Sequence, residues 1–126
     1  PIIHSLPSNT ALLTAIANDI SYDNVFSYQL EKYGEENDVL IAISSSGNSL
    51  NIINALKVAK DIGMKTISFV GFDGGNAKLL SDCCVHIAIN NYGIVEDIHQ
   101  SLMHMLSQFL RLKHLNNPNE LNEKIF

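Results

Sequence analysis

The chain has 126 residues, of which 46% are hydrophobic and 17% are charged, and its formal net charge is −5. This length suits one domain with a substantial core, and a negative charge without a Lys or Arg cluster argues against nucleic acid as a partner. No apolar run approaches the ~18 residues of a membrane span and no signal peptide opens the chain, so we expect a cytoplasmic protein that does not contact a membrane.

Apolar segments of strand length alternate along the chain with segments of helical period. This alternation is typical of βα units, so we predict an α/β fold in which helices cover both faces of a parallel sheet. The N-terminal part predicts a short strand over residues 2–5 and helices over residues 9–18 and 24–33, the second of which ends near Gly34.

The next elements are, in order, a strand over residues 39–43, a helix over 50–62, a strand over 66–70, a short helix over 76–80, a strand over 84–89 and an amphipathic helix over 95–114. The strand over residues 39–43 has the length and residue types of a strand buried on both faces. We expect a domain over residues 1–115, followed by a polar C-terminal tail over residues 116–126.

A segment that we call the serine loop, residues 44–49, follows the strand over residues 39–43 and reads Ser44-Ser45-Ser46-Gly47-Asn48-Ser49. It lies where the first N–H groups of a helix lack intrahelical partners and carry the positive end of the helix dipole. Phosphate satisfies both, and the hydroxyls add donors. Without a lysine, the loop is not a Walker A motif. A helix cap with spare serines is the structural alternative, but four hydroxyls in six residues favour a phosphate site.

The glycine-rich loop over residues 71–75 follows the strand over residues 66–70. In parallel α/β sheets, ligands bind outside the carboxyl ends of the strands, where this loop and the serine loop both emerge. We therefore expect the two loops to border one crevice.

The only cysteines, Cys83 and Cys84, are adjacent and lie in an apolar run. This arrangement offers neither a disulfide framework nor a CxxC metal site. We predict two buried, reduced thiols.

The last helix carries polar side chains one turn apart at Glu96, Gln100 and His104. A carboxylate and an imidazole on one helix can bind a metal or share proton transfer near neutral pH. Alone the pattern is weak, because a helical histidine beside acids is more often a solvated surface group. His99 is the other histidine without a simple structural explanation.

The dipeptide Asn18-Asp19 follows an apolar helical face. It is most simply an Asx turn or a helix terminator, because both side chains readily bond their own backbone. Recognition of sugar hydroxyls is the functional alternative.

In these segments the chain resembles the sugar isomerase (SIS) domain family and, within it, the phosphoheptose isomerases. The resemblance covers about residues 2–113, and its strongest marks are residues 14–19, 38–49, 63–66 and 91–99 with His104. It implies a three-layer, flavodoxin-like fold of the SIS type and a homotetramer whose sites lie between subunits. It also implies an aldose–ketose isomerisation through an enediol.

The resemblance implies a role for individual residues. The sugar phosphate would be held by Ser44, Ser45, Ser46 and Ser49, and the substrate would also meet Asn18 and Asp19. The histidine that matches His104 transfers a proton and, where zinc is found, is a ligand. Glu96 stands where the family has a glutamine, so it could join His104 as a zinc ligand or shift the choice of substrate. No nucleotide cofactor is expected.

The family begins with a helical segment, a strand with a glycine-rich loop, and a helix that bears a histidine and the glutamate base. None of these precedes Pro1, so we expect the first strand and the base to be absent from this chain and the native protein to be longer. The loop over residues 90–94 also lacks the acidic and arginine residues of the best-known heptose enzymes, which leaves the exact sugar open.

The function predicted from the sequence is conversion of sedoheptulose 7-phosphate to D-glycero-D-manno-heptose 7-phosphate for a bacterial surface polysaccharide. The main alternative is a non-catalytic SIS module that binds a phosphosugar as a regulatory or protein-interaction domain. A structural α/β domain without a ligand is the third possibility.

Overall fold

The computed structural model describes residues 2–114, so the predicted tail over residues 116–126 lies outside the described part. Within that part, a parallel sheet has the strand order β1-β2-β3. Its strands are β1 (Val39–Ser44), β2 (Lys65–Val70) and β3 (Cys83–His86). All three therefore place their carboxyl ends at one edge, as the sequence predicts.

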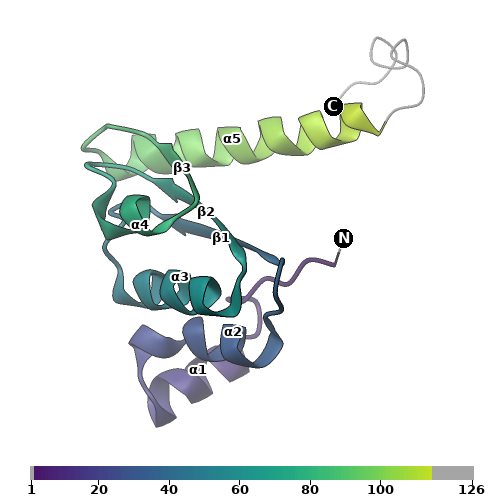
Figure 1. Cartoon of the computed structure of the whole chain (residues 1–126). Coiled ribbons are helices and arrows are strands. Elements are labelled where there is room, and N and C mark those ends of the chain that lie inside the picture. The colour runs from purple at the N-terminus through teal and green to yellow at the C-terminus, as the bar shows by residue number, and fades with distance from the viewer. Residues whose placement is uncertain (1, 115–126) are drawn as a thin grey trace.

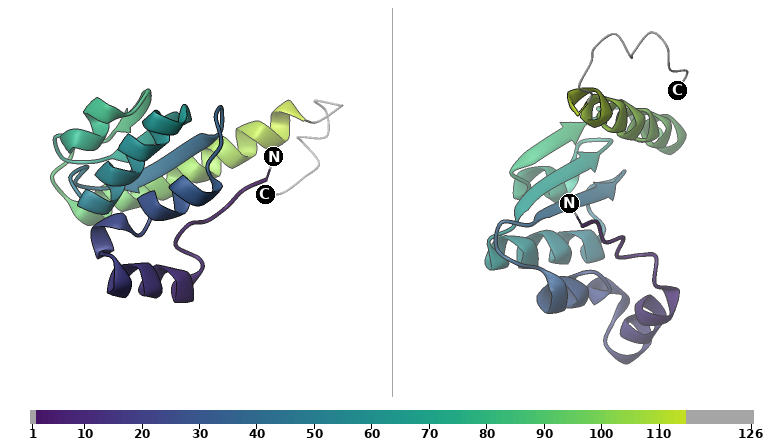
Figure 2. Two further views of the ribbon diagram at one scale, coloured as in Figure 1. Left: turned by 60° about the horizontal axis from the view of Figure 1, so that its bottom comes forward. Right: turned by 90° about the vertical axis from the view of Figure 1, so that its right-hand side faces the viewer.

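Helices lie on both sides of this sheet (Figures 1 and 2). They are α1 (Thr10–Asp19), α2 (Ser27–Tyr33), α3 (Leu50–Ile62), α4 (Gly75–Leu80) and α5 (Tyr92–Lys113), with a 3-10 turn, η1 (Tyr22–Asn24), between α1 and α2. Helix α3 covers one face, and α2 and η1 pack on its outer side; α5 lies on the opposite side of the sheet and runs out past it. The predicted α/β class with a parallel sheet is confirmed.

The main core lies between β1 and α3. Leu40 and Ala42 point from β1 toward Ile53, Leu56 and Ala59 of α3, and all five are buried. The alternating apolar residues of the strand thus meet the apolar stripe of the helix, which is how a sheet face and a helix exclude water together.

Local signals place the ends of α1 and α3 within one residue of the prediction, whereas α2 begins three residues after its predicted start at residue 24. The side chain of Asn9 accepts a hydrogen bond from the N–H of Leu12 at 3.0 Å and so caps the start of α1. Gly63 ends α3 with a φ of 91°, a left-handed conformation that suits glycine. Helix α5 begins three residues before its predicted start at residue 95, because the side chain of Asn91 accepts from the N–H of Ile94 at 3.1 Å and caps the helix there.

Two strand predictions are wrong. Residues 2–5 form no strand, and the side chains of Ile2 and Ile3 are exposed because this segment pairs with none of the described strands. Strand β1 is buried on one face only: Val39, Ile41 and Ile43 are each about half exposed. Helix α5 instead contacts Phe69 and Val70 of β2, so it leaves that face of β1 uncovered.

The prediction for the cysteines is also wrong in part. Cys83 is exposed and Cys84 is partly buried, and both thiols are free. Cys83 lies at the outer strand of the described sheet, where no further strand covers it.

Among residues 2–114, no helix is both long enough and apolar enough to span a membrane.

Candidate functional site

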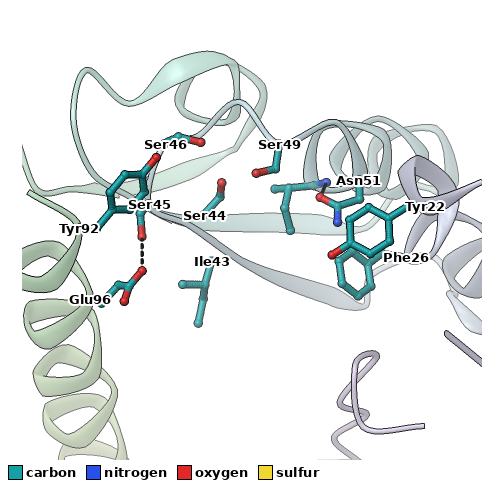
Figure 3. Close-up of a pocket in the computed structure, with 11 residues that line it drawn as sticks. Tyr22, Phe26, Ile43, Ser44, Ser45, Ser46, Ser49, Asn51, Tyr92 and Glu96 are labelled. Carbon is teal, nitrogen blue, oxygen red and sulfur yellow. Dashed lines mark hydrogen bonds between the residues drawn. The ribbon is translucent and has the colours of Figure 1, made fainter. Parts of the chain in front are cut away.

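A pocket of about 520 Å³ opens at the carboxyl end of β1. The four serines of the serine loop line its centre, with Tyr22 and Phe26 at one end and Tyr92 and Glu96 at the other (Figure 3). A pocket lined by both hydroxyls and apolar side chains therefore lies at the predicted position of a ligand site, outside the carboxyl ends of the parallel strands.

The serine hydroxyls differ in how far the protein already engages them. Ser44 is buried and its hydroxyl accepts from the N–H of Gly47 at 3.2 Å. The hydroxyl of Ser45 donates to Glu96 Oε1 at 3.3 Å, and that of Ser46 accepts from the N–H of Asn48 at 3.3 Å. Ser49 occupies the cap position of α3, yet its side chain makes no capping bond. Its hydroxyl thus stays available to a molecule in the pocket.

The backbone of the serine loop is fixed by the loop over residues 71–75, where the N–H of Gly71 donates to the carbonyl of Ser45 at 2.7 Å, and by the first turn of α4. The N–H of Ala77 donates to the carbonyl of Gly47 at 2.9 Å, and the N–H of Asn76 donates to Asn48 Oδ1 at 3.0 Å. Gly47 has a φ of 67°, and a Cβ there would lie 2.0 Å from the carbonyl oxygen of Gly74. The two loops are therefore neighbours, and only glycine fits at position 47. The prediction that both border one crevice is confirmed only in part, because none of residues 71–75 lines the pocket.

Helix α5 supplies the wall that faces the loop. Its first turns are anchored by Val95, which is buried against Gly71, and this places Tyr92 and Glu96 at the pocket. The ring of Tyr92 packs on that of Phe72, with centroids 4.7 Å apart. Within residues 2–114, the pocket lining contains one carboxylate, that of Glu96, and no Lys or Arg. An anion would therefore be held by hydroxyls and helix N–H groups rather than by a cationic side chain.

The structure does not bring Asn18 and Asp19 into this pocket. The side-chain amide of Asn18 donates to Asp19 Oδ1 at 2.9 Å at the exposed end of α1, and neither residue lines the pocket. The turn that follows them instead contributes Tyr22 and Phe26. These last two, together with Asn51 and Tyr92, are lining residues that the sequence interpretation missed. Only the position of Tyr92 inside the segment 91–99 hinted at a role.

The polar line on α5 forms in part. Gln100 Nε2 lies 3.4 Å from His104 Nε2, so the predicted contact one turn apart exists. A second cavity, of about 130 Å³, is bordered by Glu96, His99 and Gln100 and shares Glu96 with the main pocket. His104 lines neither cavity.

A metal site is not complete within the described residues. Among residues 2–114, no group of three His, Cys, Asp or Glu side chains lies close enough to hold an ion. Glu96 and His104, the predicted ligands, are two donors of suitable chemistry. They are eight positions apart, or about 12 Å along the helix axis, and a zinc ion prefers four ligands.

Comparison with known proteins gives consistent similarities. The SIS domain family matches residues 2–71. A phosphoheptose isomerase of Helicobacter pylori is 44% identical over 115 residues, which are 91% of this chain and 59% of that protein. A probable phosphoheptose isomerase of Thermoplasma acidophilum is 43% identical over 102 residues, which are 81% of this chain and 56% of that protein. The chain thus spans little more than half the length of these curated relatives.

The fold is similar to that of solved structures. A phosphoheptose isomerase from Neisseria gonorrhoeae superposes with a TM-score of 0.84 at 34% identity, over 86% of this chain and 60% of that one. A phosphoheptose isomerase from Francisella tularensis gives a TM-score of 0.78 at 30% identity, over 80% of this chain and 55% of that one.

Proposed function

The chain belongs to the SIS domain family, and from this premise we propose that it is the phosphosugar-binding part of a phosphoheptose isomerase. The reaction would convert sedoheptulose 7-phosphate to D-glycero-D-manno-heptose 7-phosphate, in the supply of heptose for a bacterial surface polysaccharide. The observation that carries the proposal is the serine-lined pocket at the carboxyl end of β1, in a chain 41–47% identical to phosphoheptose isomerases.

The serine loop would bind the phosphate group. Ser45, Ser46 and Ser49 line the pocket with their hydroxyls, and Ser44 is proposed as a fourth contact although it already supports Gly47. The N-terminus of α3 adds backbone N–H groups and the positive end of its dipole. Since no Lys or Arg lines the described pocket, these neutral donors would carry the phosphate affinity.

The rest of the pocket would hold the sugar. Glu96 borders both cavities, and its carboxylate accepts hydrogen bonds, as recognition of sugar hydroxyls requires. Asn18 and Asp19 are proposed as further substrate contacts on the strength of the resemblance. Their distance from the described pocket means that a substrate would have to reach them from outside it.

The chemistry of the proposed isomerisation is proton transfer. A base removes a proton from C1 of the ketose while the oxygen at C2 gains one, which gives an enediol; return of a proton to C2 and loss of one from the oxygen at C1 gives the aldose. We assign proton transfer to His104, the imidazole that matches the family histidine. This assignment rests on the resemblance, because His104 lines neither described cavity.

We also propose one zinc ion per site, with Glu96 and His104 as two of its ligands. A zinc ion would supply Lewis-acid stabilisation of charge on the sugar oxygens. The described residues lack a third suitable donor nearby, so the remaining ligands would have to come from elsewhere. Metal analysis of the purified protein tests this: zinc near one equivalent, lost in both Glu96→Ala and His104→Ala, is expected, and zinc retained by both variants would contradict it.

A homo-oligomer, in particular a tetramer, is proposed for the assembled protein in the cytoplasm. Its support is the outer half of α5, where Met105, Leu106, Phe109 and Leu110 are exposed. Exposed apolar side chains grouped on one helix are typical of contact surfaces. Light scattering on the wild type and on Phe109→Lys tests this: a tetramer that the substitution dissociates is expected, and a wild-type monomer would contradict it.

Turnover of sedoheptulose 7-phosphate by the natural protein that carries this chain tests the proposed function. We expect Ser46→Ala to raise KM and His104→Ala to lower kcat, whereas His114→Ala, at the far end of α5, serves as the matched control. Binding without turnover in the wild type would favour the regulatory SIS module instead. Absence of both would favour a structural domain.

A further inference from the structure

His99 is a buried histidine beside the proposed sugar site. It lies on α5, one turn after Glu96, and is only 3% exposed. Its ring packs edge-on against Phe69 of β2, with centroids 5.9 Å apart at 76°. A buried imidazole needs partners for both ring nitrogens, because an unpaired buried polar atom costs free energy.

One nitrogen has a partner that fixes the tautomer. His99 Nε2 lies 3.3 Å from the carbonyl oxygen of Val70 at the carboxyl end of β2. A carbonyl only accepts, so Nε2 carries the hydrogen and the neutral ring presents a lone pair at Nδ1. The same carbonyl accepts from the N–H of Ile87 at 2.9 Å, which uses its second lone pair. The bond from His99 therefore ties α5 to the carboxyl edge of β2.

The other nitrogen has no protein partner. Among the described side chains, His99 Nδ1 is one of the buried polar atoms without a hydrogen bond. The ring borders the cavity of about 130 Å³ that Glu96, Gln100 and Met103 also line. These four residues have the spacing i, i+3, i+4 and i+7, so they share one face of α5. His99 and Glu96 thus border the same small space, and the one ring nitrogen of His99 without a partner is buried beside it.

Two acceptors cannot bond each other, but water can join them. The lone pair of His99 and the carboxylate of Glu96 both need a donor, and one water molecule supplies two O–H groups. The cavity exceeds the ~10–15 Å³ that a water needs, and the amide of Gln100 can donate to the water oxygen. This gives the water three protein partners, the usual number for a buried site.

We propose that His99 is a positioning residue, which orients the Glu96 carboxylate through a bridging water in this second cavity. Glu96 then presents its other lone pairs to Ser45 and to the sugar hydroxyls in the main pocket. The role rests on the proposed function, because it concerns how a residue of the proposed sugar site is held. The water in the second cavity would thus orient a residue that borders the main pocket.

Two substitutions at His99 separate this role from simple packing. Gln places an amide near the position of Nε2 and keeps the bond to Val70, but loses the lone pair at Nδ1; Asn keeps an acceptor at the Nδ1 position and loses the bond to Val70. We expect His99→Gln to keep Tm near the wild-type value while kcat falls about twofold to tenfold, the range for a lost hydrogen bond between neutral groups. We expect His99→Asn to have a lower Tm than His99→Gln but a higher kcat.

His4→Gln, at an exposed histidine, is the matched control and should change neither quantity. If kcat follows Tm across the two His99 variants, with Gln near wild type and Asn the slower, the residue only anchors α5 and the proposal is wrong. Wild-type levels of kcat in both variants would overturn it as well.

Nitrogen NMR of the His99 ring tests whether a water bridges His99 and Glu96, and it needs no measurement of turnover. We expect the tautomer with hydrogen on Nε2, an Nδ1 shift typical of a hydrogen-bonded acceptor, and a change in that shift in Glu96→Ala but not in Ser101→Ala. A free lone pair, the other tautomer, or an Nδ1 shift indifferent to Glu96→Ala would refute the bridge. If the wild type lacks turnover while these shifts appear, the isomerase proposal fails and the bridge stands.

Discussion

The two edges of the sheet use similar polar side chains in opposite ways. At the amino edge, the carboxylate of Asp82 accepts from the N–H of Thr66 at 2.8 Å and from its hydroxyl at 2.9 Å, and the N–H of Asp82 donates back to that hydroxyl at 2.9 Å. At the carboxyl edge, Ser49 makes no capping bond, and Ser45 meets Glu96 at 3.3 Å.

The two edges differ in which groups complete the hydrogen bonds of their polar side chains. The groups at the amino edge satisfy one another, so they lock β2 to the start of β3 and leave little for a ligand. The groups at the carboxyl edge keep donors and acceptors free around a pocket. Substitutions at the amino edge should therefore change stability alone, whereas those at the carboxyl edge should change ligand affinity.

The largest effect is expected for Gly47→Ala, because its new Cβ would clash with the backbone that shapes the carboxyl edge. The new Cβ would lie 2.0 Å from the carbonyl oxygen of Gly74, at a φ of 67°. Overpacking against backbone and strain at positive φ should together cost about 3 kcal/mol of unfolding free energy and abolish phosphosugar binding. Urea unfolding and calorimetry measure the two effects.

Gly93→Ala is the matched control for this substitution. A Cβ there would meet only Asn91 Oδ1, at 3.5 Å, and the residue lies in α5. Because alanine favours a helix more than glycine does, the unfolding free energy should rise by up to about 1 kcal/mol. Equal destabilisation by both changes would mean that the contact with Gly74 does not shape the loop.

A smaller effect, confined to affinity, is expected for Ser49→Ala. The hydroxyl makes no capping bond, so its loss should leave Tm unchanged while affinity for sedoheptulose 7-phosphate falls about tenfold to a hundredfold, the range for a bond to a charged group. Ser101→Ala, which removes a hydroxyl bonded to the carbonyl of Asp97 on α5, should leave affinity intact. If Ser49→Ala lowers Tm but leaves the affinity unchanged, the Ser49 hydroxyl stabilises the fold rather than binding the ligand, which contradicts the role assigned to the carboxyl edge.

The smallest effect belongs to the amino edge and depends on pH. The backbone N–H of Thr66, and next its hydroxyl, lower the pKa of Asp82 below the ordinary aspartate value, which is about 3.9. Because the pKa is lowered in the folded state, ionised Asp82 stabilises the fold above that value, and the contribution is lost as pH falls through the folded pKa. The stability should therefore decline in acid below about pH 4.

Thr66→Val tests this because it removes the hydroxyl and keeps the N–H. Urea unfolding over a series of pH values should show a smaller acid-induced loss of unfolding free energy than in the wild type, with unchanged phosphosugar affinity. Thr14→Val, on the exposed side of α1, is the control. If Thr66→Val loses as much unfolding free energy in acid as the wild type does, the Thr66 hydroxyl does not stabilise ionised Asp82.

Sequence patterns predict most of the helices and their ends, because caps such as Asn9 and Gly63 act locally. They fail for residues 2–5 and for the burial of β1, because both depend on what lies beside the strand. An apolar alternation says which residues can be buried, but only tertiary contacts determine whether a helix covers them. Helix α5 contacts Val70 of β2 through His99, which no periodicity specifies.

The candidate site shows the same division. The serine loop is predictable because its hydroxyls, its glycine and its position between strand and helix are contiguous in sequence. Tyr22, Asn51 and Tyr92 come from three separate elements, so their convergence depends on the fold. The link from His99 to Glu96 is equally hidden, since it depends on which ring nitrogen the carbonyl of Val70 engages.

The central claim is that the carboxyl edge binds a sugar through its phosphate. Titration calorimetry of the natural protein with sedoheptulose 7-phosphate and with unphosphorylated sedoheptulose tests it most directly. We predict saturable binding of the phosphorylated sugar, competition by inorganic phosphate, and no detectable binding of sedoheptulose. Equal affinity for the two sugars, or no binding of either, would contradict the claim.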